Sequence, residues 1–129
     1  MPVTYMNSKV GAYQQVAAHG GVAAADPQRL ITLLLDGALT RIAEARGCLN
    51  RDAHQQKTSH LRRALAIVTE LRTCLALEHG ELPKNLDRLY EFVERQLLRA
   101  HTDQSVHLLD DACSILSEIR SAWVLLARK

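Results

Sequence analysis

The chain has 129 residues, a length that suits one domain with a real core, and 47% of them are hydrophobic while only 4% are aromatic. Leucine and alanine supply most apolar residues, which favours helices over a β-sandwich, because sandwiches need β-branched and aromatic side chains. A formal charge of +2 gives no sign of a nucleic acid or an anionic membrane as a partner.

The sequence also indicates a compartment. Cys48, Cys74 and Cys113 are odd in number, and each lies in an apolar helical pattern. We interpret them as small hydrophobic side chains in a reducing compartment, without a disulfide framework. No apolar run approaches the ~18 residues of a membrane span, and no continuous apolar segment of a secretory signal is present. A cytosolic protein without membrane insertion is therefore predicted.

Residues 1–25 differ from the rest of the chain. Their apolar residues, among them Val10 and Tyr13, are too few and too loosely spaced to form a core. The pair Gly20 and Gly21 then supplies a flexible joint. A short isolated helix is marginally stable in water, so we predict a mobile N-terminal arm that contains one short helix.

The first long helix is predicted from about Pro27 to Leu49, with Asp26 as its N-cap. Its apolar residues sweep an arc of roughly 240° at ~100° per residue. They are Leu30, Ile31, Leu33, Leu34, Leu35, Leu39 and Ile42. This helix is expected to lie centrally in a bundle or to keep apolar surface for a partner. Gly37 costs roughly 1 kcal/mol of helix stability against alanine, which indicates either that another backbone passes close or that the glycine arose by neutral drift.

Three more helices are predicted from apolar residues that recur every three or four positions. The second lies within residues 54–79 and ends at Gly80 as its C′ residue; the third covers about 83–101, and Asp103 caps the fourth. The three stripes are Leu61, Ala64, Leu65, Val68, Leu71 and Leu75, then Leu86, Leu89, Tyr90, Val93, Leu97 and Ala100, and finally Val106, Leu109, Ala112, Cys113, Leu116, Ile119, Trp123 and Leu126.

Two large apolar residues of the third helix lie beside its stripe. Phe92 flanks it, and Leu98 falls among charged residues and is expected to face outward. Four amphipathic helices with short connections imply antiparallel neighbours. We predict an all-α fold, an antiparallel up-down-up-down four-helix bundle of residues 26–129 that forms a single domain, 1–129, with the arm.

No pattern of a catalytic or metal site is found. A di-iron bundle needs Glu-x-x-His, and no glutamate here has a histidine three residues later. His54 and His60, like His101 and His107, are six residues apart and point to different faces. There is no phosphate loop, dinucleotide fingerprint or nucleophile elbow. We expect no enzymatic activity, no metal and no cofactor.

Several segments coincide, in order and spacing, with those of one known family. They are Tyr13 in the arm, DPQRLITLLLDGAL at 26–39, the helix around 67–75, Gly80-Glu81 followed by NLDRLYEFVERQLLRAH, and ILSEIRSAW at 115–123. Together they resemble the flagellar secretion chaperones, the FliS family. Leu35 stands where the family often has tyrosine, and Asp26 replaces its usual serine cap.

The resemblance implies a bundle, monomeric when free, that binds the disordered C-terminal segment of flagellin one to one in the bacterial cytosol. It also implies that this segment is protected from premature polymerisation and delivered to the flagellar type III export apparatus. Other flagellar regulators or export-gate components are further candidate partners. The residues assigned to flagellin binding are Val10, Tyr13, Ile31, Leu35, Leu39, Ile42, Tyr90, Phe92 and Leu98.

Two other classes of protein stay open at this point. A non-enzymatic helical adaptor for a folded partner would need a contiguous flat apolar patch. A metal-dependent bundle enzyme would contain bound metal. The wide apolar arc of the first long helix favours a binding protein.

Overall fold

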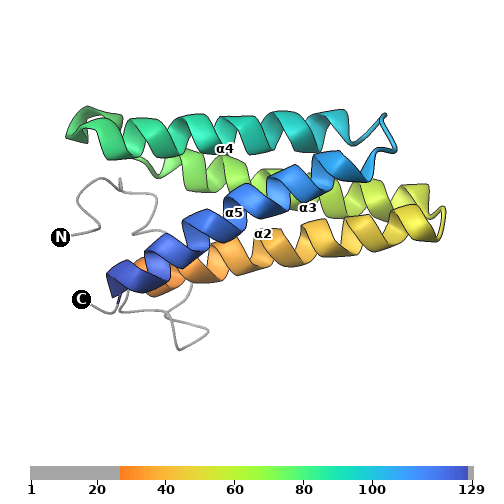
Figure 1. Ribbon diagram of the computed structural model, residues 1–129, viewed down its shortest axis with the longest axis horizontal. Helices are drawn as coiled ribbons and strands as arrows, with labels where there is room; N and C mark the ends of the chain where they lie inside the picture. Colours follow the sequence, from red (N-terminus) through yellow and green to blue (C-terminus); the bar gives the residue numbers. More distant parts are fainter. Residues whose placement is uncertain (1–26, 128–129) are drawn as a thin grey trace.

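Four long α-helices make up most of the part of the chain that the computed structural model describes, residues 27–127 (Figure 1). They are α2 (Pro27–Asn50), α3 (His54–Thr73), α4 (Glu81–Arg99) and α5 (Val106–Ala127), with a 3₁₀ turn, η1 (Leu77–His79), before α4. The predicted all-α four-helix bundle is confirmed. The predicted arm, its glycine joint and the cap at Asp26 lie outside the described residues.

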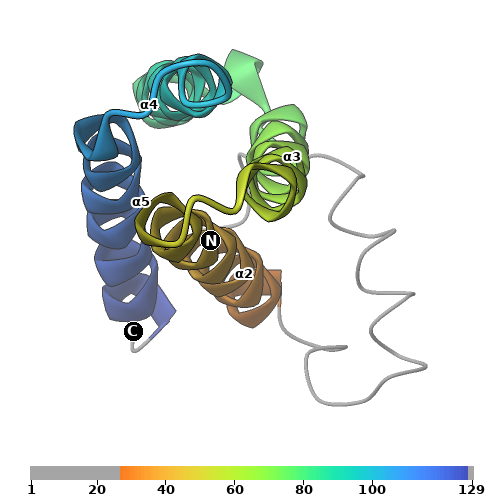
Figure 2. The same cartoon turned by 90° about the vertical axis from the view of Figure 1, so that its right-hand side faces the viewer.

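The helices are packed in a ring, as the end view in Figure 2 shows. Helix α2 packs against α3 and α5, and α4 packs against the same two helices. All four contribute side chains that are completely buried, for example Leu35, Leu61, Val93 and Leu116. The core therefore runs along the axis of the ring, and each helix contributes a stripe to it.

The wide apolar arc of α2 is divided between its two neighbours, α3 and α5. Ile31, Leu35 and Ile42 are at most 1% exposed, because one part of the arc packs against α3 and another against α5. Of the leucines in the arc, Leu33 is the most accessible, at 41%. Most of the arc is thus used inside the bundle.

Gly37 does not lie against another backbone, so that prediction is wrong. A β-carbon at this position would have as its nearest neighbour the Cδ1 atom of Ile67, at 3.5 Å. This is an ordinary van der Waals distance to a side chain, and an alanine would fit.

The connection between α3 and α4 differs from the prediction. Helix α3 ends at Thr73, and Gly80 directly precedes α4 after the 3₁₀ turn. Gly80 has φ 112° and ψ −161°, a region that is open almost only to glycine. It is both the C-cap of the 3₁₀ turn and the N-cap of α4, so the prediction that Gly80 ends the second long helix, α3, is wrong.

The predicted cap of the last helix is also displaced. Helix α5 begins at Val106, and the Oδ1 atom of Asp103 accepts a hydrogen bond from the N–H of Ser105 at 2.9 Å. Asp103 thus orders the turn before α5 and does not receive a hydrogen bond from its first turn. Among residues 27–127, no helix has the length and apolar character needed to cross a bilayer.

A candidate binding groove between α4 and α5

Ion pairs hold α4 against α3. The guanidinium of Arg72, on α3, donates from Nε to Oδ1 of Asp87 at 2.6 Å and from Nη1 to Oε1 of Glu94 at 2.7 Å. Hydrogen bonding to Asp87 is the main reason why the pKa of Arg72 is raised above its ordinary value. The Thr69 hydroxyl also donates to Oε2 of Glu94 at 2.9 Å.

A second set of ion pairs holds α5 against α2. Arg46 Nε donates to Oδ1 of Asp110 at 2.9 Å, and Arg120 on α5 donates to Asp36 on α2. The hydrogen bonds to Asp110 and Asp36 raise the pKa of Arg46 and of Arg120, respectively. These pairs are partly exposed, so they set the alignment of the two helices more than they add to stability.

The contact between α4 and α5 has a different character. A hydrogen bond between two polar side chains joins them, from Gln96 Nε2 to Oδ2 of Asp111 at 3.3 Å. From this contact the two helices diverge towards the end of the bundle at which α4 begins and α5 ends (Figure 1). The diverging ends leave apolar surface uncovered between them.

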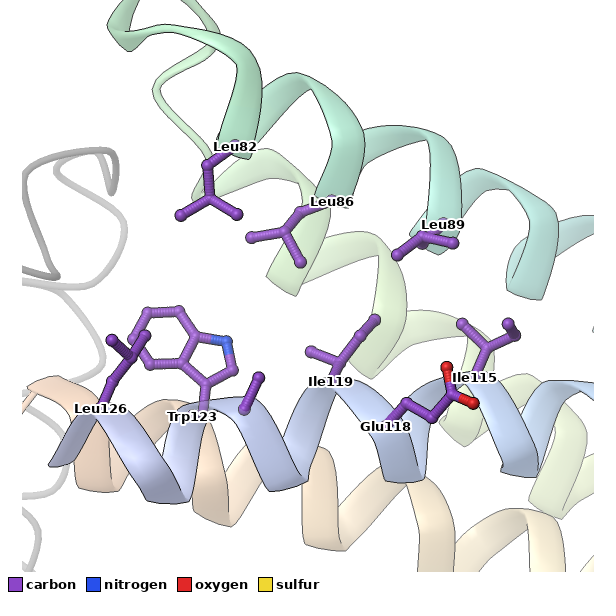
Figure 3. A pocket seen from close by; sticks show the side chains of 9 residues that line it. Leu82, Leu86, Leu89, Ile115, Glu118, Ile119, Trp123 and Leu126 are labelled. Carbon is purple, nitrogen blue, oxygen red and sulfur yellow. The ribbon is translucent and has the colours of Figure 1, made fainter. Parts of the chain in front are cut away.

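We call this surface the α4–α5 groove (Figure 3). Its residues are Leu82, Leu86 and Leu89 on α4, and Ile115, Glu118, Ile119, Ala122, Trp123 and Leu126 on α5. The space between the two walls is about 560 Å³ and includes open solvent. Leu82 is 50% exposed and Leu89 is 38% exposed, whereas Trp123 forms a buried floor at 2%.

The groove continues past Ile115 into a shallower hollow. Phe92, Asp111 and Ser114 line that hollow together with Ile115. The hydrogen bond between Gln96 and Asp111 lies at the far end, where Arg99 also donates to Oε1 of Gln96 at 3.3 Å. The apolar surface thus has an open end at Leu126 and a polar end at Gln96.

The chemistry of this groove is that of a binding surface. Its walls carry aliphatic and aromatic side chains with one carboxylate, and Figure 3 shows Leu82, Leu86 and Leu89 facing the residues of α5. A groove between two helices with such walls suits the apolar face of an amphipathic helix. Within residues 27–127, no three His, Cys, Asp or Glu side chains gather in a way that could hold a metal ion.

The predicted flagellin-binding residues are distributed over different environments. Ile31, Leu35, Ile42 and Tyr90 are at most 1% exposed and pack in the core, where a ligand reaches them only after a rearrangement. Leu39 is partly buried against the core.

The remaining predicted residues lie near the surface or outside the described part. Phe92 is partly exposed in the shallow hollow. Leu98 is 54% exposed, as the prediction that it faces outward required, and at ~100° per residue it points about 120° away from Phe92. Val10 and Tyr13 lie outside the described residues. Of the seven predicted residues that the structure describes, Phe92 lies beside the groove, in the hollow that continues it.

Other residues of the groove were not assigned to binding from the sequence. Leu89 was placed in the core stripe of its helix, and Ile115 and Ala122 in no stripe at all. A usable signal was present, because Ile115 and Ala122 are seven residues apart and therefore share one face of α5, beside its core stripe.

A family profile and several known proteins are similar to the chain. The profile of the family described as flagellar protein FliS matches residues 7–129. Flagellar secretion chaperone FliSB of Pseudomonas aeruginosa is 42% identical over 112 residues, 86% of this chain and 89% of that protein. Flagellar secretion chaperone FliS of Vibrio cholerae is 34% identical over 92% of this chain and 88% of that protein. Flagellar secretion chaperone FliS of Salmonella typhimurium is 32% identical over 97% of this chain and 94% of that protein.

Proposed function

Because this chain belongs to the FliS family of flagellar secretion chaperones, we propose that it binds the disordered C-terminal segment of flagellin in the bacterial cytosol. The complex contains one copy of each chain, and the free chaperone is a monomer. Binding prevents premature polymerisation of flagellin and keeps the segment ready for the flagellar type III export apparatus. The protein carries out this task without catalysing a reaction.

The α4–α5 groove is the observation that carries this proposal. Its exposed leucines leave apolar surface that a second apolar face can cover. A disordered segment gains such a face when it folds into an amphipathic helix on binding. Coupled folding of this kind buries on the order of 1,000–3,000 Å² and gives a negative heat-capacity change.

The predicted contacts divide by accessibility. In this proposal Phe92 extends the groove, and Leu39 and Leu98 offer contacts to parts of the segment that continue beyond it. Val10 and Tyr13 contribute from the arm. Ile31, Leu35, Ile42 and Tyr90 take part only if the helices move apart on binding, because they are buried in the free bundle.

Calorimetric titration with the C-terminal segment of the flagellin from the same bacterium tests the proposal. We expect one-to-one binding with a negative heat-capacity change. Ala122→Gln places a polar side chain in the groove and should weaken binding about tenfold, the equivalent of about 1.4 kcal/mol. Ala66→Gln is the matched control, because Ala66 is an exposed alanine within α3 and outside the groove.

Two results would count against this proposal. Absence of heat and of a complex with the unaltered chain rejects flagellin as the ligand. Equal affinities of the Ala122→Gln and Ala66→Gln variants would reject the α4–α5 groove as the binding surface, even if flagellin binds.

A further inference from the structure

Among the residues that the structure describes, Glu118 is the one charged residue that lines the α4–α5 groove. It lies one turn from Ile115 and one turn from Ala122 on α5, and Figure 3 shows its side chain among the apolar residues of that wall. Within the described part of the chain, no hydrogen bond or ion pair joins the Glu118 carboxylate to another side chain. Its neighbours on the helix differ, since Asp110 pairs with Arg46 and Asp111 accepts from Gln96.

An occupant of the groove changes the surroundings of this carboxylate. In the free protein Glu118 is exposed and hydrated. A helix that covers Ile115 and Ala122 removes water from the space beside it. Desolvating a carboxylate without a partner is unfavourable, whereas a cation supplied by the ligand forms an ion pair at the edge of an apolar contact. The groove therefore discriminates between amphipathic helices that differ in one charge.

We propose that Glu118 is a specificity-determining residue that pairs with a lysine or arginine of the helix occupying the groove. This inference rests on the proposed function and specifies the ligand, an amphipathic helix of the flagellin C-terminal segment. In that helix, the cation lies within one turn of the apolar side chains that contact Ile115 and Ala122. The pair adds to selection among partners more than to total affinity.

The test compares charge variants at two salt concentrations. The flagellin segment is titrated into the unaltered chain, Glu118→Gln and Glu118→Lys at about 50 and about 500 mM NaCl. At low salt Glu118→Gln should bind about threefold more weakly and Glu118→Lys at least about tenfold more weakly. At high salt, Glu118→Gln should approach the unaltered chain. Glu70→Gln, which neutralises a glutamate on α3 away from the groove, should match the unaltered chain at both concentrations.

A charge swap in the ligand then identifies the partner. Each lysine and arginine of the segment is replaced by glutamate in turn, and one replacement should restore the affinity of Glu118→Lys. Thermal melting of each variant excludes a folding defect as the cause.

The inference is overturned if Glu118→Gln and Glu118→Lys bind like the unaltered chain at both salt concentrations, a result that leaves the proposed function intact. It is also overturned if no ligand replacement restores the affinity of Glu118→Lys. Absence of binding by the unaltered chain rejects the proposed function itself, and the inference with it.

Discussion

Gly80 and Gly37 differ in what the backbone requires of them. At Gly80 the positive φ of 112° excludes side chains, although the space around it is open. Gly37 lies within α2, where an added β-carbon meets Ile67 at an ordinary distance. The first glycine is needed for conformation, and the second is not.

We predict opposite effects of alanine at these two positions. Gly80→Ala should lower the free energy of unfolding by about 1–3 kcal/mol, the cost of a sparsely populated backbone conformation. Gly37→Ala should raise it by about 0.5–1 kcal/mol, because alanine is the better helix former. Urea denaturation of both variants measures the two values. Equal stability of Gly80→Ala and the unaltered chain would contradict the assigned conformation.

For individual residues, the sequence predicted well which side of each helix is buried. It predicted less well which residues are accessible in the groove. The spacing of Leu86 and Val93 gives their direction correctly, and both are buried. Leu89 has a similar direction but is 38% exposed, because α4 and α5 diverge at its position. Periodicity indicates the angle of a side chain about its own helix and carries no information on the distance to the next helix.

At the scale of the elements, α4 is positioned by its ion pairs with α3. The three carboxylates within 4 Å of the Arg72 guanidinium belong to Asp87, Glu91 and Glu94. Glu94 is the least accessible, with its side chain 13% exposed. Arg95 pairs with Glu91 at 3.8 Å across one helical turn, but the Arg95 side chain is 62% exposed.

Replacement of these two arginines by methionine should separate their roles. Arg72→Met leaves partly buried carboxylates without their cation and should cost on the order of 1–3 kcal/mol of unfolding free energy. Arg95→Met removes an exposed pair and should cost at most about 0.5 kcal/mol. Chemical denaturation of both variants provides the measurement. A loss from Arg95→Met as large as that from Arg72→Met would show that burial of the pair does not determine its contribution.

The bounds of the elements were predictable where apolar periodicity is continuous, as in α2. The bounds were less predictable where a turn depends on the backbone conformation of a single residue. From the sequence alone, Gly80 could end one helix or precede the next. Asp103 could likewise be the N-cap of a helix or belong to the turn before that helix. Side-chain preferences at these positions are shared by several local structures, and the tertiary contacts decide between them.

At the scale of the whole molecule, one end of the bundle concentrates positive charge around His101. Burial is the main reason why the pKa of His101 lies below its ordinary value, and the positive charges of Arg62 and Lys57 lower it further. Lys57 is only 2% exposed and donates to Oε1 of Gln104 at 3.3 Å. Protonation of His101 would place another cation in this cluster.

We therefore predict that stability falls on acidification. The unfolded chain, with a histidine pKa near 6.5, takes up the proton at a higher pH than the folded chain does. The contribution of His101 is thus complete above about pH 6.5 and is lost as the pH falls towards the lowered pKa of the folded state. His101→Gln should reduce the difference between melting temperatures measured at about pH 7.5 and about pH 5.5.

His79→Gln serves as the control, because His79 is exposed on the 3₁₀ turn. It should keep the pH dependence of the unaltered chain. If both variants show that same dependence, the acid sensitivity arises elsewhere in the molecule.

The direction of the helices determines where a ligand segment could be fused to the chain so that it reaches the groove. Helix α2 begins and α5 ends at the end of the bundle where the groove is open, and Leu126, near the end of α5, lines it (Figure 1). A ligand segment fused to either of these helix ends through a short flexible linker would remain close to the groove. Such linkers give effective concentrations in the millimolar range, so a segment of modest affinity would stay bound. Its occupancy would then be independent of how dilute the protein is.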